Sequence, residues 1–277
     1  MLVAAIPSFV KAGCLVSALS PEEKRNLETL FRNLFLDKQF GYTLLGDKPA
    51  SVTGHFKVIP PGNMHPMAYT FNQEWETWEK QKLAFDHYLL LQRPHPKVKD
   101  LRSITFINKR AFLEVVRENI DLFQERLGAL VSAEGLLEEI EHSSLDLKAI
   151  LYEDEALYGI VLGYGRHNAL LFKRYFELFS SVDRVQASDY PFSPKIPRRK
   201  NFFSLQEELK YLERKLSSPP EKCSPFSLVA PVYFGGDPED EQTEVLREKY
   251  RELRKKITAF YSEGNCFEKT LEILLQS

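Results

Sequence analysis

Glycine, cysteine, tryptophan and methionine are all scarce in this chain. It holds 13 glycines, 3 cysteines, 2 tryptophans and 3 methionines among 277 residues. Average proteins contain roughly 7% glycine, so the shortage disfavours a glycine-rich cofactor-binding fold. The cysteines form no C-x-x-C pair, which excludes a disulfide framework and a zinc-finger spacing. We expect Cys14, Cys223 and Cys266 to be small buried side chains.

A charge excess and long apolar runs are missing as well. The 37 Lys and Arg residues nearly balance the 39 Asp and Glu residues, and the net charge is −2. This balance argues against a nucleic-acid binder. No window approaches the ~18 uncharged apolar residues that a membrane helix needs, so we expect no transmembrane segment. With 43% hydrophobic residues, the chain is predicted to be soluble and globular rather than disordered.

The first residues leave two locations open. The apolar segment 1–6 has no preceding positive charge, and Pro7 and Lys11 interrupt it, so it is a poor signal peptide. A cytoplasmic location is therefore favoured. Ala12-Gly13-Cys14 nevertheless resembles the end of a bacterial lipoprotein signal, although Lys11 departs from that pattern. Envelope attachment through a lipidated Cys14 is the alternative if the true start lies upstream.

Helical periodicity and capping residues dominate the rest of the chain. Ser20 with Glu23, and Ser204 with Glu207, have the spacing of capping boxes. Helices are predicted over 20–36, 72–91, 108–127, 132–141 and 145–152, over 153–179 with an interruption at 159–168, and over 204–216, 241–262 and 267–275. Strands are predicted over 40–46, 51–59, 67–71, 103–107 and 226–234, and the first two are expected to form a hairpin with an exposed turn at 46–49.

These elements predict a helix-dominated α+β fold with a small, mostly antiparallel sheet, because the strands do not alternate regularly with helices. We expect an N-terminal arm over 1–19 and a single globular domain over 20–277. The stretch 181–203 has no visible period and is predicted to be a flexible loop.

Aromatic residues are abundant, with 20 Phe and 12 Tyr. Several phenylalanines occur at helical spacings: Phe31, Phe112, Phe123, Phe172 and Phe176. That spacing predicts that these side chains lie in the core rather than on a binding surface.

Two short segments of the sequence contain five of the 13 glycines. They are Phe40-Gly-Tyr-Thr-Leu-Leu-Gly-Asp-Lys-Pro49 and Leu157-Tyr-Gly-Ile-Val-Leu-Gly-Tyr-Gly-Arg-His-Asn-Ala169. The pair resembles an uncharacterised protein family of chlamydia-like intracellular bacteria, over these two stretches and the helices around them. The resemblance implies a bacterial origin and is compatible with envelope attachment. It implies no activity, substrate or cofactor.

The segment Gly163-Tyr-Gly-Arg-His-Asn168 is the best candidate for a ligand site. Gly163 and Gly165 allow positive φ, so successive amides can form an anion-binding nest. The following helix, with Asn168 as its predicted N-cap, adds positive charge at its N-terminus. Arg166, beside His167, could bind a phosphate or carboxylate. The segment matches neither G-x-G-x-x-G nor the P-loop, so a tightly packed corner between two helices is the alternative.

A second candidate is a basic proline-rich loop. Pro194-Lys-Ile-Pro-Arg-Arg199 fits the P-x-x-P-x-R pattern of SH3-domain ligands. Pro194, Pro197, Arg198 and Arg199 are therefore predicted as an interaction loop, with an ordinary solvent-exposed loop as the alternative.

No catalytic signature occurs in the sequence. The histidines lack metal-ligand spacing, and neither H-E-x-x-H nor G-x-S-x-G is present, so we expect no metal and no cofactor. The sequence predicts a non-enzymatic interaction or structural protein with a protein partner. The alternative is a small-molecule-binding protein or enzyme with a phosphate or carboxylate site at residues 163–168.

Overall fold

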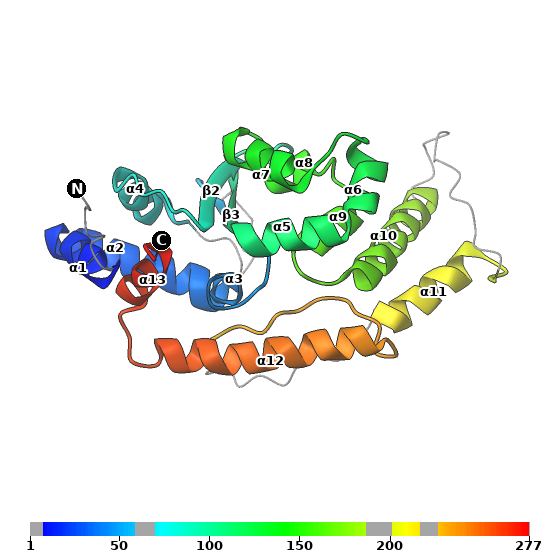
Figure 1. The fold of residues 1–277 in the computed structure, drawn as a ribbon. Coiled ribbons are helices and arrows are strands. Elements are labelled where there is room, and N and C mark those ends of the chain that lie inside the picture. Colours follow the sequence, from blue (N-terminus) through cyan, green and yellow to red (C-terminus); the bar gives the residue numbers. More distant parts are fainter. Residues whose placement is uncertain (1–7, 59–69, 187–200, 217–226, 277) are drawn as a thin grey trace.

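A computed structural model describes residues 8–58, 70–186, 201–216 and 227–276 (Figure 1). Helices surround a three-stranded antiparallel sheet, which confirms the predicted α+β class. The strands are β1 (Ala50–Phe56), β2 (Tyr88–Pro94) and β3 (Leu101–Asn108). The helices are α1 (Ser8–Ala18), α2 (Pro21–Arg32), α3 (Phe40–Leu45), α4 (Asn72–Lys80), α5 (Lys109–Glu118), α6 (Ile120–Leu127), α7 (Ala133–His142), α8 (Leu147–Ile150), α9 (Glu155–Val161), α10 (Arg166–Gln186), α11 (Leu205–Leu216), α12 (Glu241–Tyr261) and α13 (Cys266–Leu274), with a π-helical turn, η1, at Asn33–Asp37.

The sheet separates two hydrophobic clusters. Its order is β1-β3-β2, and Val52 of β1 and Leu91 of β2 both pair with Thr105 of the central strand. Because side chains alternate along a strand, Phe106 enters one cluster and the adjacent Ile107 enters the other.

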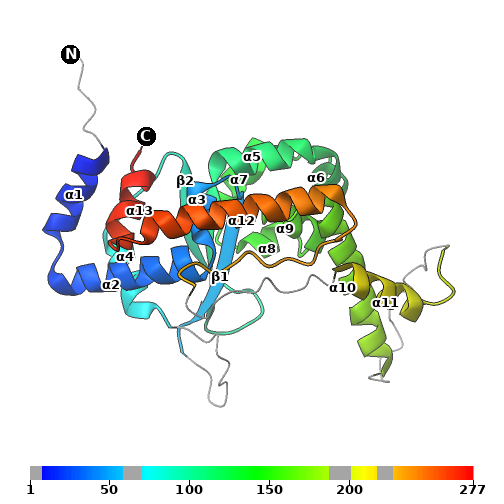
Figure 2. The same ribbon diagram turned by 90° about the horizontal axis from the view of Figure 1, so that it is seen from below.

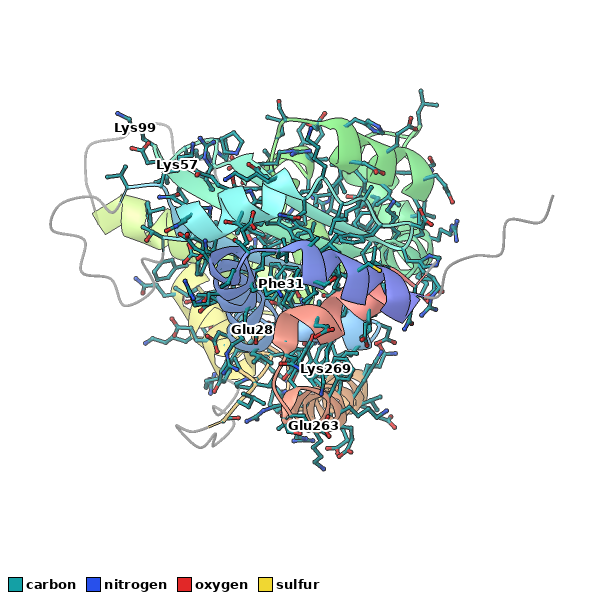
Figure 3. All side chains as sticks on the ribbon, turned by 90° about the vertical axis from the view of Figure 1, so that its left-hand side faces the viewer. Glu28, Phe31, Lys57, Lys99, Glu263 and Lys269 are labelled. Atoms are coloured by element: carbon teal, nitrogen blue, oxygen red, sulfur yellow. The ribbon has the colours of Figure 1, made fainter. Side chains whose placement is uncertain are left out.

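The first cluster is built from α1 to α4, α12 and α13, and aromatic rings fill much of it. The ring centroids of Phe31 and Phe267 are 4.9 Å apart, and those of Phe35 and Phe106 are 5.2 Å apart. Figure 3 looks onto this end, where Glu28 and Phe31 of α2 lie beside α13. The Glu28 carboxylate accepts hydrogen bonds from the backbone amides of Cys266 and Phe267 at 3.0 and 2.8 Å, so it caps α13 from another helix.

The second cluster lies on the other face of the sheet, among α5 to α9 and the start of α10. Phe112 and Phe123 are fully buried there, as their helical spacing predicts. Figure 2 shows α12 lying across both halves of the molecule, from the α13 end to the side where α6 and α10 lie.

Helices α10 and α11 form a helical arm. Figure 2 shows α11 and the C-terminal half of α10 projecting away from the other helices. The arm has its own small cluster of Leu178, Leu209 and Leu212. The fully buried Glu208 accepts hydrogen bonds from Nε and Nη2 of Arg174 at 2.7 and 2.8 Å. The arm is thus held by a few apolar contacts and one buried ion pair.

The predicted capping residues are confirmed. The Ser20 hydroxyl accepts from the Glu23 amide at 3.2 Å while the Glu23 carboxylate accepts from the Ser20 amide at 2.9 Å. Ser204 accepts from the Glu207 amide at 3.1 Å. Gly128 ends α6 with a φ of 119°, and the helix predicted over 108–127 is divided at residue 119 into α5 and α6.

The predicted hairpin over 40–59 is wrong. Residues 40–45 form α3, and β1 pairs with β3 instead. Gln39 adopts a left-handed φ of 70°, which turns the chain into a new helix after η1. A Cβ on Gly41 would lie 2.6 Å from the Phe35 carbonyl oxygen. In a short apolar run that is buried on all sides, helical and strand periodicity cannot be told apart, so the pattern of this run also fits a strand.

Two further predictions are wrong. The continuous helix predicted over 72–91 ends at Lys80, and residues 88–94 form β2 instead. The strand predicted over 226–234 does not form in the described residues 227–234, which belong to no strand. Lys82, with a φ of 49°, lies beyond the end of α4. The predicted strand over 67–71 falls mostly outside the described residues. Cys266 is buried as predicted and Cys14 is exposed, while Cys223 also lies outside the described residues.

Lys48 is buried rather than at an exposed hairpin tip. Its side chain is 1% exposed, its Nζ donates to the Ala50 carbonyl, and the ammonium lies 5.6 Å from the centroid of the Tyr164 ring. Burial lowers the pKa of Lys48 to about 7. The amine therefore sits where its charged form is unfavourable.

We predict that Lys48→Met stabilises the fold at neutral pH. The pKa of Lys48 is about 7 in the folded protein and roughly 10.4 in the unfolded chain. As the pH falls from roughly 10.4 to 7, the unfolded chain binds a proton at Lys48 that the folded protein does not bind, so the free energy of unfolding decreases. At pH 7 this penalty reaches at most about 5 kcal/mol. After loss of the bond to the Ala50 carbonyl, we expect a gain of about 2 kcal/mol at pH 7 that vanishes by pH 10.

Urea unfolding at pH 7, 8.5 and 10 measures this difference. The matched control is Lys24→Met, because Lys24 is exposed on α2, and it should change the free energy of unfolding little at any of these pH values. A gain from Lys48→Met that does not depend on pH would contradict the explanation.

We also predict that Glu208→Ala loosens the arm without unfolding the rest. Arg174, whose side chain is 11% exposed, would lose its bidentate partner, at a cost of about 3 kcal/mol. Hydrogen exchange should accelerate in α11 and stay unchanged in α5. Glu213→Ala, at an exposed position of the same helix, is the control, and equal acceleration in α5 would show that the arm is not a separate unit.

Candidate functional site

The segment 163–168 forms the corner between α9 and α10, which cross at their small residues. A Cβ on Gly159 would lie 2.9 Å from the Cβ of Ala169, so only glycine permits this approach. Gly163 has a φ of 77°, and a Cβ there would lie 2.6 Å from the Tyr250 hydroxyl and 2.9 Å from Pro49. Gly165 has a φ of 81°. The positive φ angles expected for both glycines are present.

Asn168 is the most enclosed polar residue of this corner, at 3% exposure. Its Nδ2 donates to the Tyr164 carbonyl at 3.0 Å, and its Oδ1 accepts from the Asp237 amide and the Thr243 hydroxyl, both at 3.0 Å. The predicted N-cap role is wrong, because α10 already begins at Arg166. Asn168 instead joins the corner to the segment that leads into α12.

Arg166 points away from that junction. Its Nη1 and Nη2 donate to the two carboxylate oxygens of Asp121 on α6, at 2.7 and 2.6 Å. The hydrogen bonds from Arg166 lower the pKa of Asp121 to about 2. An incoming phosphate or carboxylate would have to compete with this carboxylate for the guanidinium.

His167 belongs to a third group of contacts. Its Nε2 lies 3.4 Å from an oxygen of Asp237, whose other oxygen accepts from Nζ of Lys215 at 3.1 Å. Lys215 also pairs with Glu239. This chain of contacts connects the C-terminal end of α11 to the residues before α12, so it fixes the base of the arm.

The polar side chains of the corner therefore do not converge on one point. Arg166 binds α6, while His167 and Asn168 bind the segment around Asp237. The amides of Gly163 and Tyr164 donate back to Ile160 and Gly159 of α9. The contacts of these side chains hold helices together.

A pocket opens beside the corner, and sequence reasoning missed it. It has a volume of about 330 Å³. Its lining combines α9, the start of α10 and the segment before α12. The lining residues are Glu155, Tyr158, Gly159, Leu162, Tyr164, Asn168, Ala169, Phe172, Tyr233, Phe234 and Gly235. No sequence pattern links 155–172 with 233–235, so only the fold reveals the pocket.

Two stacked rings form one wall of the pocket. The rings of Tyr164 and Phe234 are 5.3 Å apart and inclined by 10°. Lys48 lies over the Tyr164 ring at 5.6 Å, and Arg247 lies over the Phe234 ring at 5.9 Å. Burial raises the pKa of Tyr164 to about 12, so this phenol stays neutral. Side chains of the protein itself therefore already cover both rings of this wall, with the Arg247 guanidinium in a cation–π contact with Phe234.

The charged residue of the pocket lining, Glu155, forms an ion pair within the protein. Glu155 pairs with Lys148 at 2.7 Å, and the Lys148 ammonium lies 5.6 Å from the centroid of the Tyr158 ring. The Asn168 carboxamide is occupied by the three hydrogen bonds described above. The surface that remains for a ligand is therefore mostly apolar.

An exposed row of aromatic side chains continues from the rim of the pocket along α10. Phe172, Phe176 and Phe179 are 39%, 44% and 42% exposed, and we call them the α10 stripe. The prediction that Phe172 and Phe176 are core residues is wrong. Helical spacing shows that residues share a face, but it does not show whether another element covers that face.

Ring contacts link Phe172 to Phe176 within the stripe and Phe179 to the neighbouring Tyr175. The rings of Phe172 and Phe176 are 6.4 Å apart, and Tyr175 stacks on Phe179 at 5.9 Å. Isolated exposed apolar residues are common on protein surfaces, but contiguous patches mark interaction sites.

The predicted interaction loop of Pro194, Pro197, Arg198 and Arg199 lies outside the described residues. Within the described ranges, no group of three or more His, Cys, Asp or Glu side chains is arranged to hold a metal ion. The helices of the described part also include none that is long and apolar enough to span a membrane.

Comparison with known proteins gives no relative: no family model, curated protein or solved structure matches the chain. The resemblance to a family of chlamydia-like bacteria therefore stays a prediction.

We predict that Asn168→Ala strongly destabilises the protein. The change removes three hydrogen bonds and leaves the Asp237 amide and the Thr243 hydroxyl buried without this acceptor, at a cost of about 3 kcal/mol. The matched control is Asn119→Ala, since Asn119 is 8% exposed and its carboxamide donates to the Val115 carbonyl. There we expect a loss of about 1 kcal/mol. Thermal and urea unfolding measure both losses, and equal losses would contradict the role given to Asn168.

Proposed function

We propose that the chain is a non-enzymatic interaction protein that binds an amphipathic helix of a partner protein through the α10 stripe. The observation that carries the proposal is the exposure of three phenylalanines on one face of one helix, two of which, Phe172 and Phe176, are in ring contact. Exposed phenylalanines in contact with each other are unfavourable in water, and burying them on a partner recovers that free energy.

The spacing of the stripe favours a helix as the partner element. Phe172, Phe176 and Phe179 follow i, i+4 and i+7, which forms a ridge along α10. Such ridges pack into the grooves between side chains of another helix. A partner with apolar residues at the same spacing would cover all three rings.

The size of the stripe argues against a stable dimer of this chain. At about 40% exposure, three phenylalanines leave roughly 250 Å² accessible between them. Each side of a stable protein interface buries about 800 Å². A short helical segment that binds transiently fits this area better than a second copy of the whole protein.

The arm supports the same proposal by presenting the stripe away from the body. The buried pair of Arg174 and Glu208 and the arm cluster around Leu212 lie between α10 and α11, so they hold α10 without covering the stripe. An element that is ordered before binding loses less entropy on binding.

The alternative function, an anion site at residues 163–168, has less support. Arg166 is paired with Asp121, and the carboxylate of Asp237 lies beside His167. Both contacts oppose the approach of a phosphate or a second carboxylate.

A selection for helical binders tests the proposal. A library of amphipathic helices, displayed on a small helical scaffold, is selected against the wild-type protein. We expect binders with apolar residues at i, i+4 and i+7, and we expect Phe176→Ser/Phe179→Ser to weaken them about tenfold or more. Phe203→Ser is the matched control, because Phe203 is 89% exposed and precedes α11, and it should leave binding unchanged.

Two outcomes would overturn the proposal. Selected binders that bind the double variant as tightly as the wild type would place the interaction elsewhere. Light scattering that shows a wild-type dimer and a monomeric double variant would make a second copy the occupant of the stripe.

A further inference from the structure

We infer that the pocket between α9, α10 and residues 233–235 is a binding site for an uncharged aromatic compound. The inference does not depend on the proposed function, because it concerns a small molecule rather than a helix, although Phe172 belongs to both the pocket lining and the α10 stripe. It differs from the predicted anion site in its ligand chemistry and in most of its residues, since Tyr164 and Asn168 alone belong to both.

The volume of the pocket suits a small molecule. Ligand pockets in proteins span about 300–1,000 Å³, and this one holds about 330 Å³. A bicyclic aromatic compound fits a pocket at the lower end of that range.

The charges around the pocket favour an uncharged ligand. Glu155 is paired with Lys148, and Asn168 is occupied by the corner and by the segment before α12. A ligand cation would have to displace Lys148 from Glu155. A ligand anion would meet the half-buried carboxylate of Glu155, whose side chain is 13% exposed.

The lining supplies contacts that suit a flat ring. Tyr158, Tyr164, Phe172, Tyr233 and Phe234 are five aromatic residues from three separate segments around one space. Aromatic rings stack or meet edge to face at 4.5–7 Å, and such pairs contribute beyond the area that they bury.

The two sides of the pocket differ in rigidity. Tyr164 and Phe234 are fixed by their stack and by the side chains of Lys48 and Arg247 that lie over them. Tyr233 is 52% exposed and Phe172 is 39% exposed, so these two rings form the outer rim. A ring-shaped ligand would enter past them and pack against the fixed wall.

Titration with indole tests the inference. Indole is an uncharged bicyclic ring, and its carboxylate and aminomethyl derivatives provide charged probes of nearly the same shape. Calorimetry gives the dissociation constants, and the NMR signals of the Gly159, Ala169 and Gly235 amides report the place of binding. We expect indole to bind about tenfold or more tightly than either charged derivative and to shift these three signals.

Two variants locate the site. Tyr233→Ala removes an exposed rim ring and should weaken indole binding about tenfold, while Tyr152→Ala, at a tyrosine that is 76% exposed and outside this lining, should not. Leu162→Phe adds volume inside the pocket and should abolish binding, with circular dichroism to confirm the fold. Because Tyr233 is exposed, Tyr233→Ala should fold, so this variant tests the position of the site even if Leu162→Phe does not fold.

Three results would overturn the inference. In the first, indole does not bind at millimolar concentration. In the second, a charged derivative binds more tightly than indole, and in the third, Tyr233→Ala binds indole as tightly as the wild type. Phe176→Ser/Phe179→Ser should bind indole as the wild type does, so a failure of the proposed helix interaction would not be mistaken for a failure of the pocket.

Discussion

The buried carboxamide of Asn168 is the constraint on which the rest of this structure depends. It binds the end of the corner, the backbone at Asp237 and the start of α12 at once. Because a buried polar group without a partner is costly, the three segments can separate only together. Their fixed relation places Phe234 against Tyr164, so one side chain determines both the packing of α12 and a wall of the pocket.

This constraint separates the polar and apolar parts of the corner. Arg166 and His167 are engaged with carboxylates of the protein, and these contacts orient α10 on the body. The surface that remains beside them is lined mainly by rings. The polar side chains of this Gly-rich segment therefore position the helices around it. The surface that a ligand could reach is the neighbouring pocket, not the segment itself.

Local features of the fold could be predicted from the sequence, and features that depend on distant contacts could not. The caps at Ser20 and Ser204 depend on residues three positions away, so their pattern sufficed. By contrast, α3 is helical because the backbone at Gly41 packs against Phe35 and Ile257, and the buried state of Lys48 depends on Tyr164. The pocket joins residues 155–172 to 233–235, a contact for which the chain carries no local signal.

The α10 stripe illustrates the same limit in a way that bears on function. Phe112 and Phe172 both occur in amphipathic patterns, yet Phe112 is fully buried and Phe172 is 39% exposed. The difference lies in which neighbours the topology supplies, since α5 packs on the sheet and α7 while α10, within the described residues, packs mainly on α9 and α11. Since α10 runs without a break from the corner at Asn168 to the stripe, the constraint that fixes the pocket also fixes the direction in which the stripe is presented.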